Sequence, residues 1–286
     1  MVALSIIIVN YNAKELLKGC IQSIYGQTFS TSLEIWVIDN GSKDGSAEEI
    51  GKNFPQVNWV QNKDNPGFSA ALNMGFHKMA GRYALVLNPD TFVLPDSLDR
   101  MVRFMEAQPE VGILGPKVYD DRQKTSVQLS CRRFPTWTTV LFHRYSIITK
   151  FFPNNPWSRE YLMSDKNPDS IQEVDWVSGC CMLIRRETLE QVGLFDETFF
   201  MFSEDVDYCR RAKNLGWGIF YFPEAEIVHF IGASKGKVKP RLIIERHKSI
   251  RHYLRKHCIQ NPFMAMITDT VIFLRACCLL ILNIFK

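Results

Sequence analysis

The stretch IIIVNYN, residues Ile6–Asn12, decides the fold class, because an apolar run ends there in polar side chains. VIDNGS (Val37–Ser42) and LVLNPD (Leu85–Asp90) repeat this arrangement further along the chain. Continuous apolar runs are typical of strands that are buried on both faces of a parallel sheet. Because ligands of open α/β sheets bind outside the carboxyl ends of the strands, the three polar strand ends predict a single binding cleft.

Segments with helical spacing separate the apolar runs. We expect strands at residues 3–9, 33–38, 57–61 and 83–87, with helices at 13–25, 46–53 and 67–79. This alternation predicts an α/β fold with a mostly parallel central sheet and helices on both faces. Further on we expect helices at 96–107, 187–192 and 206–214, strands at 111–119, 174–185, 217–222 and 227–229, and a long loop region over 120–172.

The composition is that of an ordinary globular protein. The chain has 286 residues, of which 46% are hydrophobic and 22% are charged. A net charge of +4 is too small to indicate a nucleic-acid partner. None of the eight cysteines forms a C-x-x-C pair, so we expect reduced thiols and a cytoplasmic location. Met1 leads almost directly into the first strand, without the features of a signal peptide.

The C-terminal end differs from the rest of the chain. Residues 235–257 contain nine Lys or Arg, three His and a single acid, Glu245, and we expect a basic helix over Pro240–His257. The apolar segment Met264–Phe285 is interrupted by Asp269 and Arg275, and its clean stretches are too short for a membrane-spanning helix of about 20 residues. The alternatives are an amphipathic helix in the membrane plane and a helix packed on the protein's own core.

Two residues are candidates for a metal site. Asp90 follows a buried strand, where its carboxylate can hold Mg²⁺ or Mn²⁺, the cations expected for a few oxygen ligands. The alternative for Asp90 is a turn, because Asn-Pro-Asp is a common turn composition. His229 ends a late strand and can complete the metal site or contact a diphosphate, although a structural role is the alternative.

The second polar strand end indicates recognition of a nucleotide base. The carboxylate of Asp39 can accept the N3–H of uracil or thymine and would reject cytosine, which has an acceptor at that position. The alternative is an Asx turn. Tyr11 can stack on the base or lie at the rim. Gly67 opens a helix whose backbone N–H groups can face an anion, or which simply begins there.

A cluster of carboxylates follows the apolar run Phe199–Phe202. A buried carboxylate among other carboxylates should have a raised pKa, which suits a general base. The alternative is acidic residues stabilising the first turn of a helix, and Asp207 fits this alternative best. Asp205 or Glu204 is the better candidate for the base.

The order and spacing of these motifs resemble the family 2 inverting glycosyltransferases, and in particular the rhamnosyltransferase-like branch that builds bacterial surface polysaccharides. The resemblance covers residues 3 to about 235. It implies a GT-A fold over residues 1–235, with a nucleotide-sugar-binding half (1–110) and an acceptor-binding half (111–235). Residues 236–286 would form a basic and amphipathic C-terminal helical extension.

The resemblance also implies roles for individual residues. Asp90 matches the last position of the family's D-x-D metal motif, in which Asn88 replaces the first Asp, and His229 would be a second metal ligand. Asp205, beside Glu204, matches the catalytic base. Trp176, Ser178 and Gly179 would line the acceptor site. The nucleotide-sugar site would comprise Asn10, Tyr11, Asp39, Asn40, Gly67, Asn73, Asn88 and Asp90.

The implied reaction moves a sugar, with rhamnose as one candidate, from a dTDP- or UDP-sugar donor to a saccharide acceptor. A divalent cation, Mg²⁺ or Mn²⁺, would neutralise charge on the leaving diphosphate. The acceptor would be lipid-linked, and the protein would attach peripherally to the inner face of the cell membrane. No nucleic acid is expected as a partner.

Two other functions are alternatives. A nucleotidyltransferase should carry a glycine-rich, basic phosphate loop after the first strand, and Asn10–Lys14 is not glycine-rich. A nucleotide-sugar-binding protein without catalytic activity is disfavoured because Glu204 and Asp205 are present.

Overall fold

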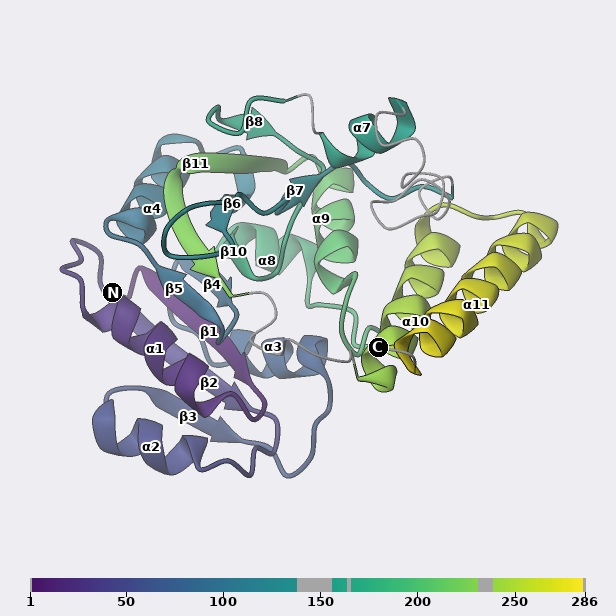
Figure 1. Ribbon diagram of the computed structural model, residues 1–286. Coiled ribbons are helices and arrows are strands. Elements are labelled where there is room, and N and C mark those ends of the chain that lie inside the picture. Colours follow the sequence, from purple (N-terminus) through teal and green to yellow (C-terminus); the bar gives the residue numbers. More distant parts are fainter. Residues whose placement is uncertain (1, 138–155, 164–165, 231–238, 285–286) are drawn as a thin grey trace.

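The computed structural model describes residues 2–137, 156–163, 166–230 and 239–284 (Figure 1). Its strands are β1 (Leu4–Asn10), β2 (Leu33–Asp39), β3 (Asn58–Gln61), β4 (Tyr83–Leu87), β5 (Thr91–Val93), β6 (Val111–Tyr119), β7 (Cys131–Arg132), β8 (Gln172–Glu173), β9 (Trp176–Val177), β10 (Cys181–Arg185) and β11 (Gly218–His229). Its helices are α1 (Lys14–Tyr25), α2 (Ser46–Asn53), α3 (Phe68–Phe76), α4 (Ser97–Ala107), α7 (Pro156–Leu162), α8 (Arg186–Val192), α9 (Glu204–Asn214), α10 (Pro240–His257) and α11 (Pro262–Ile284).

The central sheet has nine strands among the described residues. Eight follow the order β3-β2-β1-β4-β10-β6-β11-β5, and β8 pairs with β11. The long ladders β1–β2, β1–β4 and β6–β11 are parallel, whereas β10 runs antiparallel to both of its neighbours. The prediction of an α/β fold with a mostly parallel sheet is therefore confirmed.

Strand β1 shows why the sheet is covered on both faces. All seven of its residues are buried. Ile6 and Ile8 belong to a core cluster with the apolar residues of α1 and α4, while Ile7 and Val9 belong to the opposite cluster with α3 and α9. Because successive side chains of a strand point to opposite faces, a continuous apolar run of this kind requires a helical layer on each side.

Two strand predictions need correction. The predicted strand 174–185 is divided into β9 and β10, because the chain leaves the ladder at Ser178–Cys180. The predicted strands 217–222 and 227–229 form the single strand β11, with a register shift between Phe222 and Glu226. Pro223 lies in this shift, where its missing N–H costs no ladder hydrogen bond. The structure also has three short strands that we did not predict. Strand β5 pairs with the end of β11, β7 pairs with β9, and β8 pairs with β11. The predicted loop 120–172 therefore contains β7, helix α7 and the start of β8.

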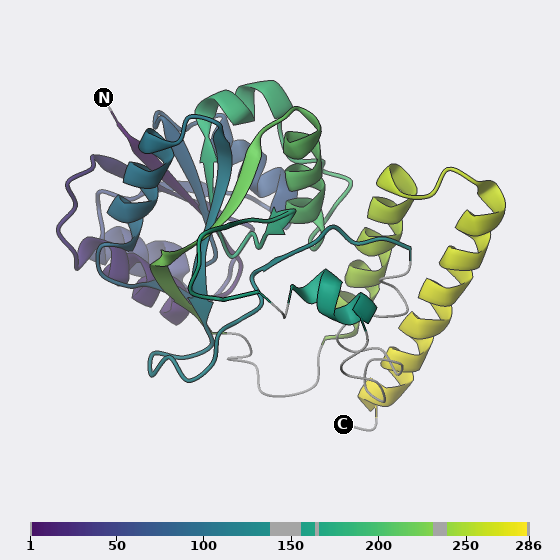
Figure 2. The same ribbon diagram turned by 90° about the horizontal axis from the view of Figure 1, so that it is seen from above.

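The last two helices form an antiparallel hairpin at one side of the molecule (Figure 2). The predicted basic helix is confirmed as α10, although Lys235 and Lys237 lie outside the described residues. The expectation that the apolar segment is too short to span a membrane was wrong. Helix α11 has 23 residues and a mean hydropathy of 2.0, enough to cross a bilayer by length and composition alone.

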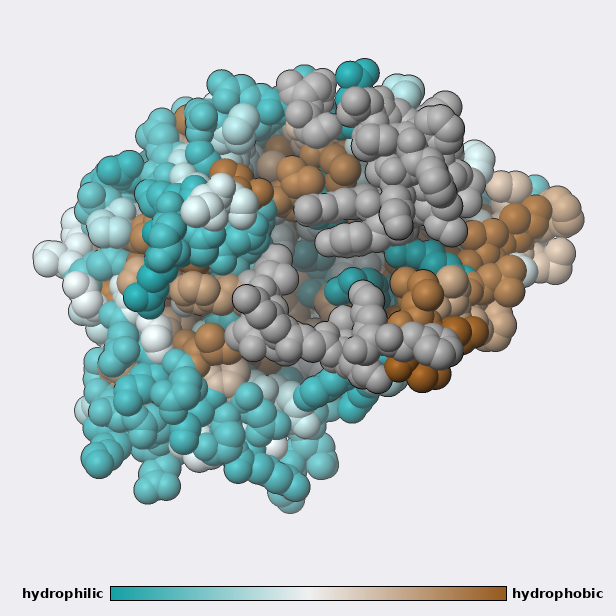
Figure 3. All heavy atoms as spheres, in the orientation of Figure 1, coloured by the Kyte–Doolittle hydropathy of each residue, from teal (hydrophilic) through white to brown (hydrophobic). Residues whose placement is uncertain are grey.

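Helix α11 contacts the protein core through only a narrow face, on which Ile272 belongs to the same core cluster as Ile7. Only 17% of its apolar window is buried, and Ala265, Thr268 and Ile272 are its buried residues. Large apolar side chains such as Phe263, Phe273 and Leu274 are exposed by 60% or more. The surface over the hairpin is therefore strongly hydrophobic, as Figure 3 shows.

Candidate active site

The first two polar strand ends are joined directly. In the parallel register of β1 and β2, Asn10 lies opposite Asp39. The Nδ2 of Asn10 donates to Oδ1 of Asp39 at 2.7 Å and to Oγ of Ser42 at 3.2 Å. Both Asn10 and Asp39 are fully buried, so the first two motifs meet at one point of the sheet edge.

The carboxylate of Asp39 is saturated with hydrogen bonds. Besides Asn10, the hydroxyl of Ser42 donates to Oδ1 at 2.6 Å, and the N–H of Ser42 donates to Oδ2 at 2.8 Å. The Nε2 of Gln61 donates to Oδ2 at 2.5 Å from the neighbouring strand β3. Gln61 is exposed, and it was not among the predicted residues. A base that donates N3–H to Asp39 has to displace this amide.

The amides of two predicted donor-site residues, Asn40 and Asn73, make hydrogen bonds within the protein. Asn40 bridges Asn65 and the carbonyl of Gly67 through its Nδ2, at 3.2 and 3.1 Å. Asn73 donates to the carbonyl of Phe195 at 2.9 Å and accepts the N–H of Phe195 at 3.0 Å. Because both sides of the Asn73 amide are used in this way and the residue is buried, its contact with a nucleotide sugar stays a prediction.

Of the predicted donor-site residues, Gly67 is packed against another backbone segment, whereas Tyr11 is exposed. Gly67 has φ +103°, and a Cβ atom there would lie 2.7 Å from the carbonyl oxygen of Phe200. The next N–H, that of Phe68, donates to the same oxygen at 2.6 Å. Glycine is therefore required for the close approach of the segment that precedes α9. Tyr11 is 51% exposed and is available for stacking.

The candidate metal residues are brought together by the short strand β5. Thr91 pairs with His229 in the register of β5 and β11, which places Asp90 beside the His229 ring. The Oδ1 of Asp90 lies 3.2 Å from Nε2 of His229 and receives no hydrogen bond, although it is buried. The Nδ2 of Asn88 lies 3.5 Å from the same Nε2. The predicted residues Asn88 and Asp90 therefore both lie beside Nε2 of His229.

A residue that we did not predict, Gln128, orients the His229 ring. Its Nε2 donates to the carbonyl oxygens of His229, at 2.6 Å, and of Tyr119, at 3.3 Å. Its Oε1 therefore faces Nδ1 of His229, at 3.1 Å, and Nδ1 carries the proton. In neutral His229 the lone pair of Nε2 then points towards Asp90, and this second-sphere arrangement is typical of metal-binding histidines.

These residues fit a divalent cation. Adjacent ligands of an octahedral Mg²⁺ or Mn²⁺ at about 2.1 Å are about 3 Å apart, close to the spacing of Asp90 and His229. A lone pair facing an unbonded carboxylate oxygen is unfavourable without a cation or a proton between them. No cluster of three or more His, Cys, Asp or Glu side chains suited to a metal occurs in the described ranges. The protein would therefore leave several coordination positions to other ligands.

The candidate base is held by the bend between β9 and β10. The N–H of Gly179 donates to Oδ2 of Asp205 at 2.9 Å, and the N–H of Val206 donates to Oδ1 at 2.8 Å. The neighbouring carboxylate of Glu204 is 7% exposed, and its Oε2 has no hydrogen-bond partner. The break in the predicted strand 174–185 thus brings Gly179, predicted for the acceptor site, to the candidate base.

Both carboxylates of this pair have raised pKa values. Burial raises the pKa of Glu204 well above its usual value, and the charge of Asp205 raises it further. Burial also raises the pKa of Asp205, although the N–H groups of Gly179 and Val206 offset part of this effect. A carboxylate with a raised pKa is the stronger base, as proton abstraction from a sugar hydroxyl requires.

The backbone is strained immediately before this pair. Phe202 and Ser203 have φ values of +70° and +63°, and neither is glycine. Two such residues in succession cost on the order of 1–3 kcal/mol each and persist only where the surroundings hold them. The turn lets α9 begin at Glu204, so that both carboxylates lie in its first turn.

Asp207, in the same turn, has a structural role, as the alternative predicted. Its buried carboxylate contacts His257 at 2.7 Å, Lys256 at 2.8 Å and Arg211 at 2.9 Å. Burial alone would raise the pKa of Asp207, but these hydrogen bonds and charges outweigh it and lower the pKa. The network fastens the end of α10 to α9.

The remaining acceptor residues lie on the strand β9 and in the bend after it. Trp176 is 8% exposed, and its indole N–H donates to the carbonyl of Arg133 at 2.9 Å. The guanidinium of Arg132 lies 5.5 Å from the Trp176 ring and lowers the pKa of Asp205. Ser178 is tied to the carbonyl of Ser130 by its N–H at 2.8 Å. Trp176 therefore supports the wall of the site, and acceptor contacts of these residues stay predictions.

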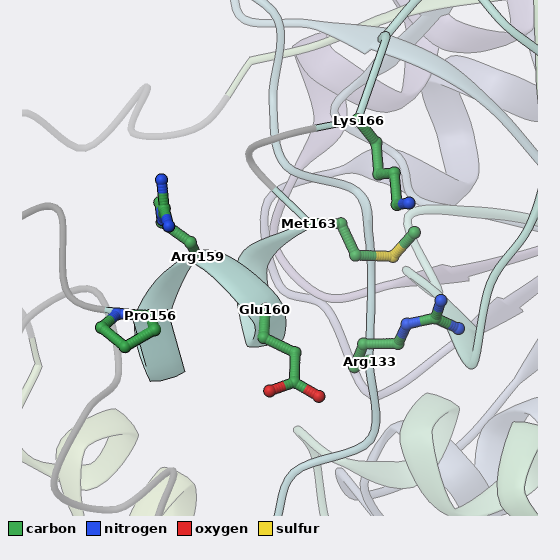
Figure 4. Close-up of a pocket in the computed structure, with 6 residues that line it drawn as sticks. All are labelled: Arg133, Pro156, Arg159, Glu160, Met163 and Lys166. Carbon is green, nitrogen blue, oxygen red and sulfur yellow. The ribbon is translucent and has the colours of Figure 1, made fainter.

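A separate cavity of about 440 Å³ lies beside α7, and Figure 4 shows its lining. The lining residues are Arg133, Pro156, Arg159, Glu160, Met163 and Lys166. Lys166 lies above Met163 and Arg133 below it in this view, whereas Arg159 lies to the left and points away from both. The cationic groups of this cavity therefore do not converge on one point.

A family model described as glycosyl transferase family 2 matches residues 5–193, which include every predicted residue of the donor site. The chain belongs to this family. It is 33% identical over 233 residues to the N-acetylglucosaminyl-diphospho-decaprenol L-rhamnosyltransferase of Mycobacterium tuberculosis, covering 78% of this chain and 74% of that protein. It is therefore a glycosyltransferase of the rhamnosyltransferase-like branch, as the motifs predicted.

Solved structures agree on the fold of this family 2 glycosyltransferase. The mannosyltransferase PcManGT from Pyrobaculum calidifontis, in complex with GDP-Man and Mn²⁺, superimposes with a TM-score of 0.60 at 17% identity, covering 98% of this chain and 72% of that one. GalNAc-T7 with UDP, GalNAc and Mn²⁺ gives a TM-score of 0.63 at 16% identity, covering 89% and 48%. The GT-A fold is confirmed.

Proposed function

We propose that this family 2 enzyme is an inverting glycosyltransferase that moves a sugar, with rhamnose as the first candidate, from a dTDP- or UDP-sugar to a lipid-linked saccharide. The observation that carries the proposal is the half-buried Asp205, which has a raised pKa and whose carboxylate accepts the N–H of Gly179. The name of the mycobacterial relative supports both rhamnose and a lipid-linked acceptor.

Asp205 would act as the general base. It removes the proton from a hydroxyl of the acceptor sugar, and the oxygen attacks the anomeric carbon of the donor. Attack occurs opposite to the leaving nucleoside diphosphate, so the configuration at that carbon inverts. One carboxylate suffices, unlike the retaining pathway, in which a second carboxylate forms a covalent intermediate.

The donor would bind along the ends of β1, β2 and β4. Asp39 accepts the N3–H of the base once the amide of Gln61 has moved aside, and Tyr11 stacks on the base. Asp90 and His229 would hold a Mn²⁺ or Mg²⁺ ion, with Gln128 fixing the histidine. Such an ion supplies Lewis-acid stabilisation of the leaving diphosphate.

We also propose that residues 1–235 form the transferase unit and that residues 236–286 attach it peripherally to the inner face of the cell membrane. The exposed apolar side chains of α11 and the cations of α10 support this proposal. Each cationic side chain close to an anionic lipid surface contributes about 1 kcal/mol to binding.

Thermal unfolding with nucleotides tests the donor and metal sites. We expect UDP or dTDP with Mn²⁺ to raise the melting temperature and CDP and GDP to leave it unchanged, since only uracil and thymine offer N3–H to Asp39 in this geometry. A ligand at a hundred times its Kd stabilises the protein by about 2.7 kcal/mol. Asp90→Asn should lose the Mn²⁺-dependent part of the shift. Equal shifts with all four nucleotides would contradict the role of Asp39.

The pH dependence of turnover tests the base. We expect the rate to fall as the pH drops through the pKa of Asp205, because only the ionised carboxylate accepts a proton. The positive charge of Arg132 lowers that pKa, so Arg132→Gln should move the acidic limb of the kcat/KM profile to higher pH, by less than about 1 unit. Arg133→Gln, next in sequence and paired with Asp175, is the matched control and should leave the limb in place. A shift to lower pH in Arg132→Gln would contradict the assignment.

A further inference from the structure

A cationic cluster lies between α10 and α11, beside the segment that carries the candidate base. It consists of Arg246 and His247 of α10 and Arg275 of α11. The ion pairs of Arg251 and Arg255 with Asp269 set the antiparallel register of the hairpin. Arg275 lies six residues after Asp269, and Arg246 lies five residues before Arg251. In antiparallel helices this register brings Arg275 to the level of Arg246.

Arg275 faces α10 and not the exposed surface of α11. It continues the spacing of the buried residues Thr268 and Ile272, and side chains three and four residues apart share one face of a helix. Burial lowers the pKa of Arg275, and the charge of Arg246 lowers it further. No carboxylate of the described chain forms an ion pair with Arg275, in contrast to Arg251 and Arg255.

His247 offers an unused polar atom at the same place. The residue is 5% exposed, its Nδ1 lies 2.6 Å from the carbonyl oxygen of Ile243, and its Nε2 has no hydrogen-bond partner. The carbonyl makes Nδ1 the donor. Burial lowers the pKa of His247, and the charges of Arg275 and Arg246 lower it further. Neutral His247 has a lone pair on Nε2, whereas the protonated ring donates from Nε2. The charges of Arg275 and Arg246 disfavour this proton, and an anion bound between them would offset that effect.

Helix α10 is connected to the segment before the candidate base by one aromatic contact and one hydrogen bond. The guanidinium of Arg246 lies 4.7 Å from the centre of the Phe202 ring, and Phe202 is one of the two strained residues before the base. The hydroxyl of Ser249 donates to the carbonyl of Met201 at 2.8 Å. An anion bound at Arg246 is therefore close to the turn that positions Asp205, and it lies on the hairpin with the exposed apolar face (Figures 1 and 3).

We propose that Arg246, His247 and Arg275 bind the diphosphate group that joins the acceptor sugar to its lipid. This inference rests on the proposed function, because it assigns the lipid-linked acceptor to a place on the enzyme. The arrangement matches the chemistry of such a molecule in order: a sugar at Asp205, a diphosphate at the cationic cluster, and an apolar chain along α11. Arginine is suited to the diphosphate because its planar fork donates two hydrogen bonds to phosphate oxygens.

Binding of farnesyl diphosphate to the full chain in mild detergent tests the site directly. We expect Arg275→Gln and Arg246→Gln each to raise the Kd at least tenfold, and Arg275→Lys to retain part of the affinity. Lys248→Gln is the matched control, since Lys248 is an exposed cation of α10 that pairs with Glu245 outside the cluster. It should change the Kd less than twofold. Farnesol, which has no phosphate, should bind all variants equally.

A structural defect and a membrane headgroup are distinguished by two further measurements. Because no carboxylate of the described residues pairs with Arg275, Arg275→Gln should unfold at the same temperature as the unmodified protein or above it. The affinity for vesicles that contain phosphatidylglycerol should fall no more in Arg275→Gln than in Lys248→Gln. Unchanged farnesyl diphosphate binding in Arg275→Gln would overturn the proposal, as would a loss confined to vesicle binding. The Mn²⁺-dependent shift with UDP or dTDP should persist in every variant, so failure of the donor site would be seen separately.

Discussion

Asp205→Asn should abolish most turnover while the protein still binds its donor. The amide cannot take up the proton of the acceptor hydroxyl, and loss of a general base lowers rates by about 10²- to 10⁴-fold. The N–H of Gly179 can still donate to the amide oxygen, so the bend after β9 should keep its position. Turnover would be measured at saturating donor and acceptor, and donor binding by the melting shift with nucleotide and Mn²⁺.

The matched control for this variant is Glu190→Gln, which makes the same type of change at an exposed carboxylate of α8. It should retain the turnover of the unmodified enzyme. Turnover by Asp205→Asn within a factor of three of the control would rule out Asp205 as the base. Loss of the nucleotide shift together with turnover would mean that the variant has lost its structure near the donor, and Glu204→Gln would then be compared.

Gly67→Ala should destabilise the protein and slow the reaction together. Its φ of +103° and ψ of 173° lie in a region that costs other residues about 1–3 kcal/mol. The added methyl group would also press on the carbonyl of Phe200, and overpacking of this kind costs about 1–3 kcal/mol more. Because Phe200 precedes the strained turn before Asp205, movement of this segment displaces the base. Denaturant unfolding and kcat measure the two effects.

Gly193→Ala separates backbone strain from the clash. Gly193 has φ +81° and ψ −165°, in the same region, but no atom lies within 4 Å of the position of an added Cβ. It should lose only the strain energy and retain kcat. If the two variants were equally stable and equally active, the close approach of Gly67 to Phe200 would have no functional importance.

Strand and helix positions in the first half were predictable because each element is decided by its own residues. The run at Ile6–Val9 is buried on both faces, and such runs are recognised from composition alone. The bulged strand β11 and the break at Gly179 were not predictable, because both depend on partners far away in the sequence. Gly179 leaves the ladder where its N–H meets Asp205, 26 residues later.

Helix α11 shows the same difference. Its apolar composition and its 23 residues are written in the sequence, yet the interrupting charges Asp269 and Arg275 led to the wrong conclusion about its length. The structure shows that Asp269 is neutralised by Arg251 and Arg255 of the preceding helix. A charge that is paired within the hairpin does not end a helix, and pairing of this kind is visible only once the hairpin is formed.

The sequence by itself determined the family, the GT-A fold, and which strand ends carry Asn10, Asp39 and Asp90, because motifs and apolar periodicity are local properties of the chain. Only the tertiary structure decided how these side chains are used. The pairing of β5 with β11 places His229 beside Asp90. Gln61 donates to the carboxylate of Asp39, and Gln128 orients the ring of His229. The physical reason is that hydrogen bonds, burial and charge depend on distances between residues remote in sequence, which no local pattern contains.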